Sequence, residues 1–248
     1  MPPISHPLIF NGRKFAEEVT QELVGKISQL DRPLKIAVLV DEQNESATRY
    51  TQLKERLAGR LRVVFSRIDS LNEAGDADGI LVQLPYPNSK QLIDKIPQAK
   101  DVDGLRSDNL FKPAVVRAIL EILKFAVVQG LLSGQVMVVG SQGFVGSRLV
   151  AELNCQGMDE GDFNADKLKQ ADTIISCTGQ ANLITADMVK PGAILIDVGA
   201  PQAEFTAQAL AKSAFYTPVP GGVGPVTVAM LFKNLYESRV GLWGAVDK

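Results

Sequence analysis

Residues 135–146 read QVMVVGSQGFVG, an apolar run that leads straight into Gly140, Gly143 and Gly146. The run predicts a buried strand of a parallel sheet, and the residues after it predict a helix that begins at the glycines. In such a unit the glycines permit a tight turn and the close approach of a diphosphate, which the free N–H groups of the helix then bind. The spacing G-x-x-G-x-x-G departs from the usual G-x-G-x-x-G, so a turn that serves packing alone stays open as an alternative.

Apolar runs and amphipathic segments alternate along the rest of the chain. We expect strands over residues 35–40, 61–65, 79–83, 135–140, 173–177 and 193–198. We expect helices after Asn11-Gly12 and over residues 46–57, 113–128 and 226–237, whereas the polar run 155–166 leaves the strand after the glycine turn weak or absent. This alternation predicts an α/β fold with mostly parallel sheets.

The length of 248 residues fits one large domain or two small ones, and we expect two. The first spans residues 1–118, and a C-terminal helix over about 225–248 packs back on it. The second spans residues 119–224 and contains the glycine turn, so the boundary falls in the long helix before Gln135.

Composition excludes several classes of protein. Hydrophobic residues make up 46% of the chain and charged residues 22%, which is typical of a globular protein rather than a disordered one. The net charge of −2 provides no basic surface for nucleic acid or an anionic membrane. Cys155, Cys177 and the single histidine, His6, make neither a disulfide framework nor a His-based triad, so we expect no metal site. No segment is typical of a membrane span or a secretory signal, so we expect a cytoplasmic protein.

The ends of two predicted strands and the polar run after the glycine turn offer further candidate ligand groups. Cys177-Thr178-Gly179 and Asp197-Val198-Gly199 each close a strand with a glycine, and ligands of open α/β sheets bind at such carboxyl ends. Asp159 follows the glycine turn by about 20 residues, the distance at which an acid holds a ribose hydroxyl. A solvated loop acid is the alternative for Asp159.

Tyr50 and Lys54 stand at positions i and i+4 of a predicted helix, so they share one face of it. An aromatic ring beside an amine suits a flat, carbonyl-rich heterocycle, because the ring stacks and the amine reaches the reactive edge. A solvated helix face with a half-buried tyrosine is the alternative interpretation.

Four segments together resemble the bifunctional methylenetetrahydrofolate dehydrogenase/methenyltetrahydrofolate cyclohydrolase family. They are TPVPGGVGPVTVAML at 217–231, GILVQLP at 79–85, KDVDG at 100–104 and YTQLK at 50–54. The resemblance covers nearly the whole chain in the right order. It implies two α/β domains, a folate-binding catalytic domain and a Rossmann-like NAD(P)-binding domain, with the active-site cleft between them.

The resemblance also implies roles for residues of the first domain. Lys54 is the central catalytic residue, Tyr50 packs against the folate, and Gln83 orients Lys54 by a hydrogen bond. Asp101 and Asp103 flank Val102, so in an extended chain both carboxylates would point the same way. A carboxylate matches the donor edge of a pterin. The resemblance favours Asp103 for that contact, whereas Asp101 either shares it or caps the turn.

Other residues are implied to lie near the cofactor. The turn of Pro220, Gly221 and Gly222 is expected where nicotinamide meets folate, unless it is only a rigid linker into the last helix. The expected cofactor-binding residues are Gly140, Ser141, Gln142, Gly143, Gly146, Thr178, Gly179 and Val219. The implied partners are tetrahydrofolate derivatives and a second copy of the chain in a homodimer.

The chain departs from the family pattern at the cofactor motif. Ser141-Gln142 stand where the family usually has Arg-Ser, and that arginine is well suited to a 2′-phosphate. Arg148 is a possible substitute. The expected cofactor is NADP, the commoner one in the bacterial family, with NAD possible.

The implied reaction has two steps. The first oxidises 5,10-methylene-tetrahydrofolate to the methenyl form, and the second hydrolyses that form to 10-formyl-tetrahydrofolate. Lys54 would accept and donate the proton if burial and Gln83 lower its pKa. The alternatives are a folate-binding paralogue that retains only the hydrolysis, an unrelated two-domain dehydrogenase of the shikimate dehydrogenase type, and a non-catalytic interaction module.

Overall fold

The computed structural model describes residues 6–131 and 134–242. The chain divides into two compact units, each with its own parallel sheet. The six-strand unit comprises residues up to Phe15 together with Val115–Val226, and the three-strand unit comprises Ala16–Ala114 together with the chain from Thr227 onward. The predicted fold class, α/β with parallel sheets, is confirmed.

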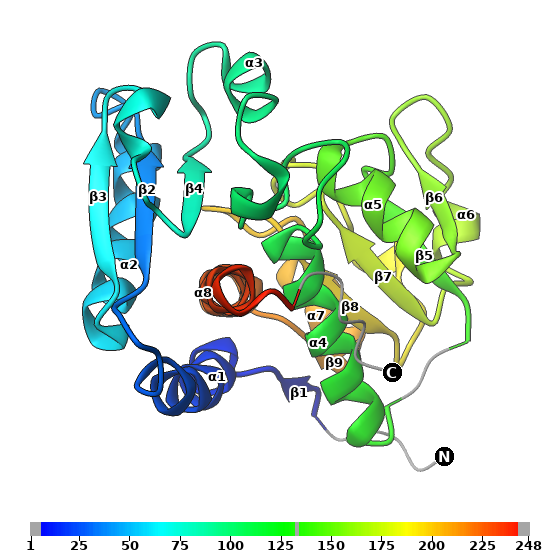
Figure 1. The fold of residues 1–248 in the computed structure, drawn as a ribbon. Helices are drawn as coiled ribbons and strands as arrows, with labels where there is room; N and C mark the ends of the chain where they lie inside the picture. Colours follow the sequence, from blue (N-terminus) through cyan, green and yellow to red (C-terminus); the bar gives the residue numbers. More distant parts are fainter. Residues whose placement is uncertain (1–5, 132–133, 243–248) are drawn as a thin grey trace. The chain divides into compact units, whose positions relative to one another are not determined.

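The three-strand unit is built around the sheet β3-β2-β4 (Figure 1). Its strands are β2 (Lys35–Leu39), β3 (Val64–Ile68) and β4 (Gly79–Val82), and both pairings are parallel. Its helices are α1 (Gly12–Ile27) from Ala16 onward, α2 (Glu45–Leu61), α3 (Ser89–Ile93) and α8 (Val223–Val240) from Thr227 onward. Short 3₁₀ turns lie at Leu71–Ala74 and Gln98–Lys100. One buried core lies between the sheet and its coverings and includes Leu39, Ile68, Ile80, Val82 and Ile96.

Helix α2 follows β2, and both of its ends are fixed by local chemistry. Asn44 caps its start, since the Asn44 side chain accepts the Ala47 N–H at 2.9 Å. Arg62 ends it in the left-handed conformation with φ 56°, and its N–H returns to the carbonyls of Ala58 and Gly59. The strand expected over 61–65 is therefore shifted to 64–68, because the helix keeps residue 61 and its cap takes residue 62.

The six-strand unit has the strand order β1-β9-β8-β7-β5-β6, again all parallel. Its strands are β1 (Leu8–Ile9), β5 (Val136–Val139), β6 (Gln156–Met158), β7 (Thr173–Ser176), β8 (Ile194–Asp197) and β9 (Phe215–Tyr216). Its helices are α4 (Ala114–Val128), which begins at the boundary, α5 (Phe144–Leu153), α6 (Ala165–Leu168) and α7 (Ala207–Lys212), with a 3₁₀ turn at Ala186–Met188.

Strand β5 is flanked by β6 on one side and β7 on the other, so the chain reverses its direction of travel across the sheet at β5. Such a switch point is where open parallel sheets bind ligands. The strand expected to be weak or absent after the glycine turn is present as β6, three residues long.

The N-terminal segment differs from the expected domain division. Strand β1 pairs with β9 of the six-strand sheet, so residues 8–9 belong with that unit rather than with the other residues of 1–118. The last helix, expected over 226–237, extends over Val223–Val240. Residues 1–5, 132–133 and 243–248, which the expected domains include, lie outside the described residues.

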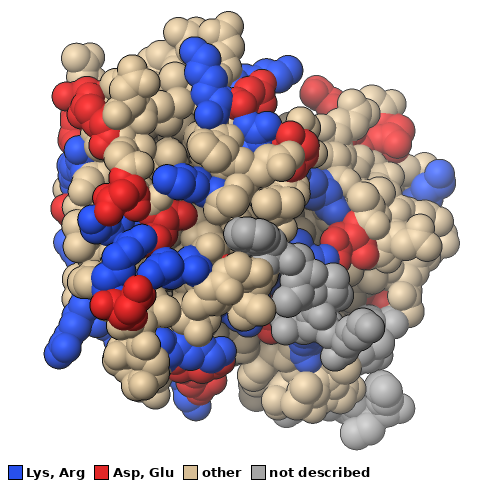
Figure 2. Space-filling view, in the orientation of Figure 1, with Lys and Arg blue, Asp and Glu red and all other residues tan. Residues whose placement is uncertain are grey.

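The surface in view in Figure 2 carries basic and acidic side chains interspersed with one another, in line with the net charge of −2. None of the helices within the described part of the chain combines the length and hydrophobicity needed to cross a bilayer.

Candidate active site

Lys54 is the buried amine of the three-strand unit. It lies one helical turn after the half-buried Tyr50 on α2, and its side chain is only 8% exposed. Its Nζ donates to Gln83 Oε1 at 2.6 Å, and Gln83 Nε2 donates to the carbonyl of Leu84 at 2.8 Å. Because the Leu84 carbonyl needs the amide nitrogen, the amide oxygen is the atom that faces Lys54.

Asp103 is the carboxylate whose negative charge influences the protonation of Lys54. Burial lowers the pKa of Lys54, and the negative charge of Asp103 opposes that shift. Burial likewise raises the pKa of Asp103, and the positive charge of Lys54 opposes it. An amine whose protonation is disfavoured by burial and supported by one carboxylate is suited to taking up and releasing a proton.

Asp101 has a different set of partners. It is buried, and its Oδ2 accepts the backbone N–H of Arg106 at 2.8 Å. Residues 102–103 form a turn rather than an extended segment, and Gly104 completes it with φ 68°. The expectation that both carboxylates point the same way from an extended chain is wrong, and this geometry favours Asp101 as the cap of the turn.

Asn234 holds the same turn from α8, and the sequence did not point to it. Its Nδ2 donates to the carbonyl of Val102 at 2.8 Å and to that of Lys112 at 3.1 Å. The side chain is fully buried, although the residue before it is Lys233. With a second polar residue beside it, no local pattern marked Asn234 as buried.

The glycine turn of the six-strand unit has the geometry of an anion-binding turn. Gly140 has φ 85°, and a Cβ on Gly146 would lie 2.1 Å from the Gly140 carbonyl oxygen. Both positions therefore require glycine, because a side chain there would be strained or would meet the backbone of the turn itself. Helix α5 begins directly after Gly143, and no side chain caps its first N–H groups.

A cavity of about 360 Å³ opens at the carboxyl ends of β5, β6 and β7. This is within the size range of small-molecule sites. Its lining comes from the six-strand unit alone and consists of Val139, Gly140, Gly143, Asp159, Glu160, Phe163, Cys177, Thr178, Gln180 and Leu183. A dinucleotide fits this place, because the turn allows close approach of its phosphates and the N-terminus of α5 supplies donors.

The other expected cofactor residues fall into two groups, one beside the cavity lining and one away from it. Ser141 and Gln142 belong to the turn and hydrogen-bond Asp159, and Gly179 follows Thr178 at the end of β7. Val219 and the turn 220–222 are not among the lining residues. Gly221 has φ 106°, and a Cβ on Gly12 would lie 1.9 Å from the Gly222 carbonyl oxygen, so this turn packs closely on the start of α1.

Glu204 organises the end of β7, and the sequence did not point to it either. The side chain is 1% exposed, and its Oε2 accepts from the Ser176 hydroxyl and from both the N–H and the hydroxyl of Thr178. Its Oε1 accepts the Gly179 N–H at 2.8 Å. Four hydrogen bonds to one buried carboxylate therefore fix the loop that lines the cavity.

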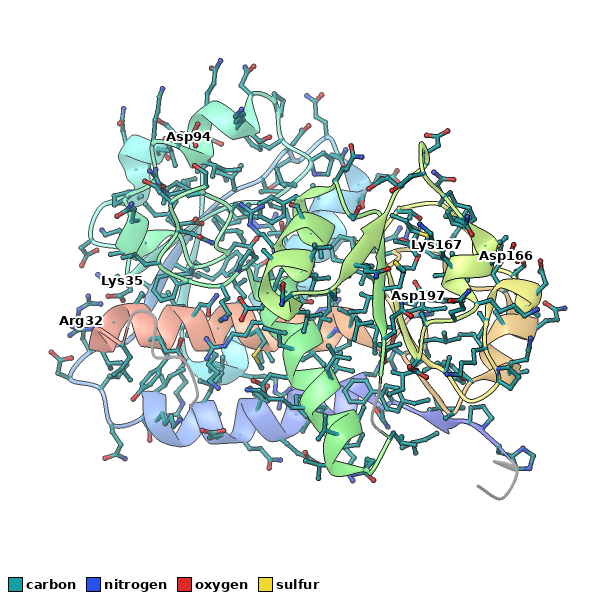
Figure 3. The ribbon with its side chains drawn as sticks, turned by 90° about the vertical axis from the view of Figure 1, so that its right-hand side faces the viewer. Arg32, Lys35, Asp94, Asp166, Lys167 and Asp197 are labelled. Atoms are coloured by element: carbon teal, nitrogen blue, oxygen red, sulfur yellow. The ribbon has the colours of Figure 1, made fainter. Side chains whose placement is uncertain are left out.

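Asp197, at the end of β8, holds the segment that carries Glu204 (Figure 3 labels Asp197). Its carboxylate accepts the N–H groups of Gly199, Glu204 and Phe205 at 2.9, 2.9 and 3.3 Å. Burial raises the pKa of Asp197 to about 6, the backbone donors oppose the shift, and the nearby charge of Glu204 adds to it.

The raised pKa of Asp197 predicts a pH-dependent stability. In the unfolded chain the pKa of Asp197 is the ordinary 3.8, so between about pH 4 and pH 6 the folded protein binds more protons than the unfolded chain. The free energy of unfolding therefore falls as the pH rises through this range. The expected loss attributable to Asp197 is about 3 kcal/mol. Denaturant unfolding across this range, compared with Asp197→Asn, measures it.

The Asp197→Asn variant also separates Asp197 from Asp101 and Asp103, whose pKa values burial raises in the same direction. The variant should retain only the part of the slope that comes from these other groups. Parallel stability curves for the two proteins would contradict the assignment to Asp197.

Residues 113–240, slightly more than half of the chain, match the profile of the tetrahydrofolate dehydrogenase/cyclohydrolase NAD(P)-binding domain. The chain is 31% identical over 278 residues to the bifunctional protein FolD of Bacillus subtilis, covering 93% of this chain and 96% of that protein. It is 36% identical over 202 residues to the bifunctional protein FolD of Lactobacillus acidophilus, covering 71% and 70%.

Solved structures agree with these matches. The FolD methylenetetrahydrofolate dehydrogenase/cyclohydrolase from Campylobacter jejuni superposes with a TM-score of 0.84 and 25% identity, covering 94% of this chain and 99% of the other. A 5,10-methylenetetrahydrofolate dehydrogenase from the silkworm, Bombyx mori, gives a TM-score of 0.82 and 28% identity, covering 95% and 99%. The resemblance carried by the four sequence segments is thereby confirmed, and the chain belongs to the tetrahydrofolate dehydrogenase/cyclohydrolase family.

Proposed function

We propose that this protein oxidises 5,10-methylene-tetrahydrofolate to the 5,10-methenyl form and hydrolyses that form to 10-formyl-tetrahydrofolate. The observation that carries the proposal is the buried Lys54, held at 2.6 Å by Gln83 and facing the charge of Asp103. Bifunctional FolD proteins are among the relatives that the chain matches over most of its length.

In the hydrolysis, Lys54 moves the proton. As water adds to the methenyl carbon, the neutral amine takes one proton from it, and the ammonium then returns that proton to N5 as the bond between that carbon and N5 breaks. The remaining hydroxyl proton of the adduct leaves to solvent as the formyl C=O bond forms. The net change is methenyl cation plus water to the 10-formyl product and one proton. Gln83 orients the amine, Asp103 accepts hydrogen bonds from the pterin edge, and Tyr50 packs on its ring.

In the oxidation, the residues of the six-strand unit bind the cofactor. A bound nicotinamide dinucleotide supplies the hydride acceptor. Gly140 and Gly143 line the cavity and would face its diphosphate, and Gly146 lets helix α5 pack against the turn. Thr178 lines the cavity from the end of β7, and Glu204 holds both Thr178 and Gly179 in place. The family resemblance favours NADP, whereas the acidic residues Asp159 and Glu160 of the cavity lining favour NAD.

A paired assay tests the proposal. Methylene-tetrahydrofolate is supplied with NAD or NADP while the absorbance of reduced nicotinamide and of the methenyl product is followed. Methenyl-tetrahydrofolate alone is then supplied to measure hydrolysis. Both activities are expected, and the absence of both would contradict the proposal.

The same assay decides the second candidate, a paralogue with only the hydrolytic activity. Methenyl hydrolysis without nicotinamide reduction by either dinucleotide would favour it. The structure gives it little support, because the glycine positions and the loop held by Glu204 keep the geometry of a dinucleotide site. The homodimer stays a prediction, which sedimentation equilibrium would measure.

A further inference from the structure

The carboxylate of Asp159 lies against the glycine turn. It follows β6 directly, and its Oδ2 accepts the backbone N–H of Gln142 at 2.6 Å and the hydroxyl of Ser141 at 3.0 Å. Its own N–H donates to Asp162 Oδ1 at 2.6 Å. The side chain is therefore fixed by the turn and the backbone of Asp159 by Asp162, which argues against the alternative of a solvated loop acid.

The packing of β6 accounts for this position. A Cβ on Gly157 would lie 2.4 Å from the Ser141 Cβ, so the glycine lets the turn close onto β6. That close approach brings the end of the strand beside the cavity, where Asp159 is a lining residue. Both protein hydrogen bonds end on Oδ2, and an ionised carboxylate has about four acceptor positions, so Oδ1 can accept from a ligand.

The charge around the cavity is negative. Asp159 and Glu160 are both lining residues, and no lysine or arginine is among the lining residues that the structure describes. The guanidinium of Arg148 lies 3.6 Å from the centre of the Phe144 ring, and its Nη1 donates to the Phe144 carbonyl at 3.2 Å. The arginine that the sequence offered as a phosphate partner is thus held over another side chain.

The thiol of Cys177, another lining residue, responds to the same charges. Burial raises its pKa to about 12, and the negative charges of Glu204 and Asp159 add to the shift. The charge of Asp159 therefore acts across the cavity as well as on the turn.

We propose that Asp159 makes this site select dinucleotides whose adenosine ribose has a free 2′-hydroxyl, so that NAD is bound in preference to NADP. Oδ1 accepts the ribose hydroxyl, whereas a 2′-phosphate would bring about two negative charges against Asp159 and Glu160. The inference rests on the proposed function in taking the cavity as the dinucleotide site. It replaces the expectation of NADP.

Equilibrium binding tests the proposal without turnover. Calorimetric titration of the wild-type protein with NAD and NADP, and with ADP-ribose and its 2′-phosphate, should give dissociation constants at least about tenfold lower for the unphosphorylated ligands. Asp159→Asn keeps one oxygen for the Gln142 N–H and turns an amide toward the ligand, so it should reduce this preference by about tenfold or more. Equal or tighter binding of NADP by the wild type, or an unchanged preference in the variant, would overturn the proposal.

Two further variants provide a control for charge and an independent test of the preference. Asp166→Asn removes one exposed negative charge on α6 of the same unit (Figure 3) and should leave the preference unchanged. Gln142→Arg keeps the backbone N–H that Asp159 binds and adds a cation at the turn, so it should tighten NADP selectively even if Asp159→Asn fails to fold. Equal gains for both dinucleotides in Gln142→Arg would count against the proposal.

The outcomes also separate this proposal from the proposed function. If methylene-tetrahydrofolate is oxidised and NADP is the preferred dinucleotide, the function stands and the role of Asp159 is wrong. If neither dinucleotide binds and only methenyl hydrolysis is measured, both the dehydrogenase activity and the selectivity are contradicted.

Discussion

Lys54→Met should lower the rate of methenyl-tetrahydrofolate hydrolysis by about 10²- to 10⁴-fold, the usual contribution of a positioned acid–base group. Methionine fills nearly the same volume and removes the nitrogen that is 2.6 Å from Gln83 Oε1. Binding of the dinucleotide should be unchanged, because the cavity is lined only by residues of the six-strand unit. Stopped-flow absorbance of the methenyl compound and calorimetric titration of the cofactor measure the two effects.

Stability distinguishes this result from simple unfolding. Lys54→Met removes a charge that burial opposes, but it also leaves Gln83 Oε1 without its donor and Asp103 without its counter-charge. The free energy of unfolding should therefore fall, with the variant still folded in the absence of denaturant. Lys95→Met makes the same chemical change at an exposed position and should keep full activity. Wild-type hydrolysis by Lys54→Met would remove Lys54 from the mechanism.

Local sequence patterns predicted those parts of the site that lie within one element. The glycine turn is a strand, a turn and the start of a helix, so its geometry could be predicted from consecutive residues. The sharing of one helix face by Tyr50 and Lys54 follows from helical periodicity in the same way. Both predictions depend on a few backbone angles rather than on the packing of distant segments.

Contacts between distant segments needed more than a local pattern. Lys54 and Gln83 are 29 residues apart, and they meet because β2 and β4 pair in parallel while α2 follows β2. Only the family resemblance pointed to that contact. Glu204 was missed because its donors belong to residues 176–179 on a neighbouring strand, and nothing in the residues beside it shows this.

The predicted strand boundaries were wrong where a helix cap or a short edge strand determined them. The strand expected at 61–65 had the right composition, but the left-handed cap at Arg62 moved its start. Strand β6 has only three residues and two of them are Gln156 and Gly157, so no apolar run in the sequence predicted it. Its existence matters for function, because Asp159 follows it directly.

Glu204→Gln should destabilise the six-strand unit by about 3 kcal/mol. The carboxylate accepts four hydrogen bonds, and two of them come from backbone N–H groups, which can only donate. The glutamine amide has one oxygen that can accept, so its NH₂ group must face the N–H of either Thr178 or Gly179, donor against donor. One buried donor is then unsatisfied, and a charge-assisted bond is lost. Denaturant unfolding measures the loss.

Glu160→Gln supplies the matched control for stability, because the same change on an exposed side chain should alter the free energy of unfolding by less than about 0.5 kcal/mol. A second effect of Glu204→Gln separates positioning from stability. Thr178 and Gly179 lose their anchor beside the cavity, so the folded variant should bind NAD about tenfold more weakly, the factor expected for about 1.4 kcal/mol. Unfolding indistinguishable from that of Glu160→Gln would show that the four bonds do not hold the loop. Lower stability with unchanged NAD binding would show that the loop keeps its shape without Glu204.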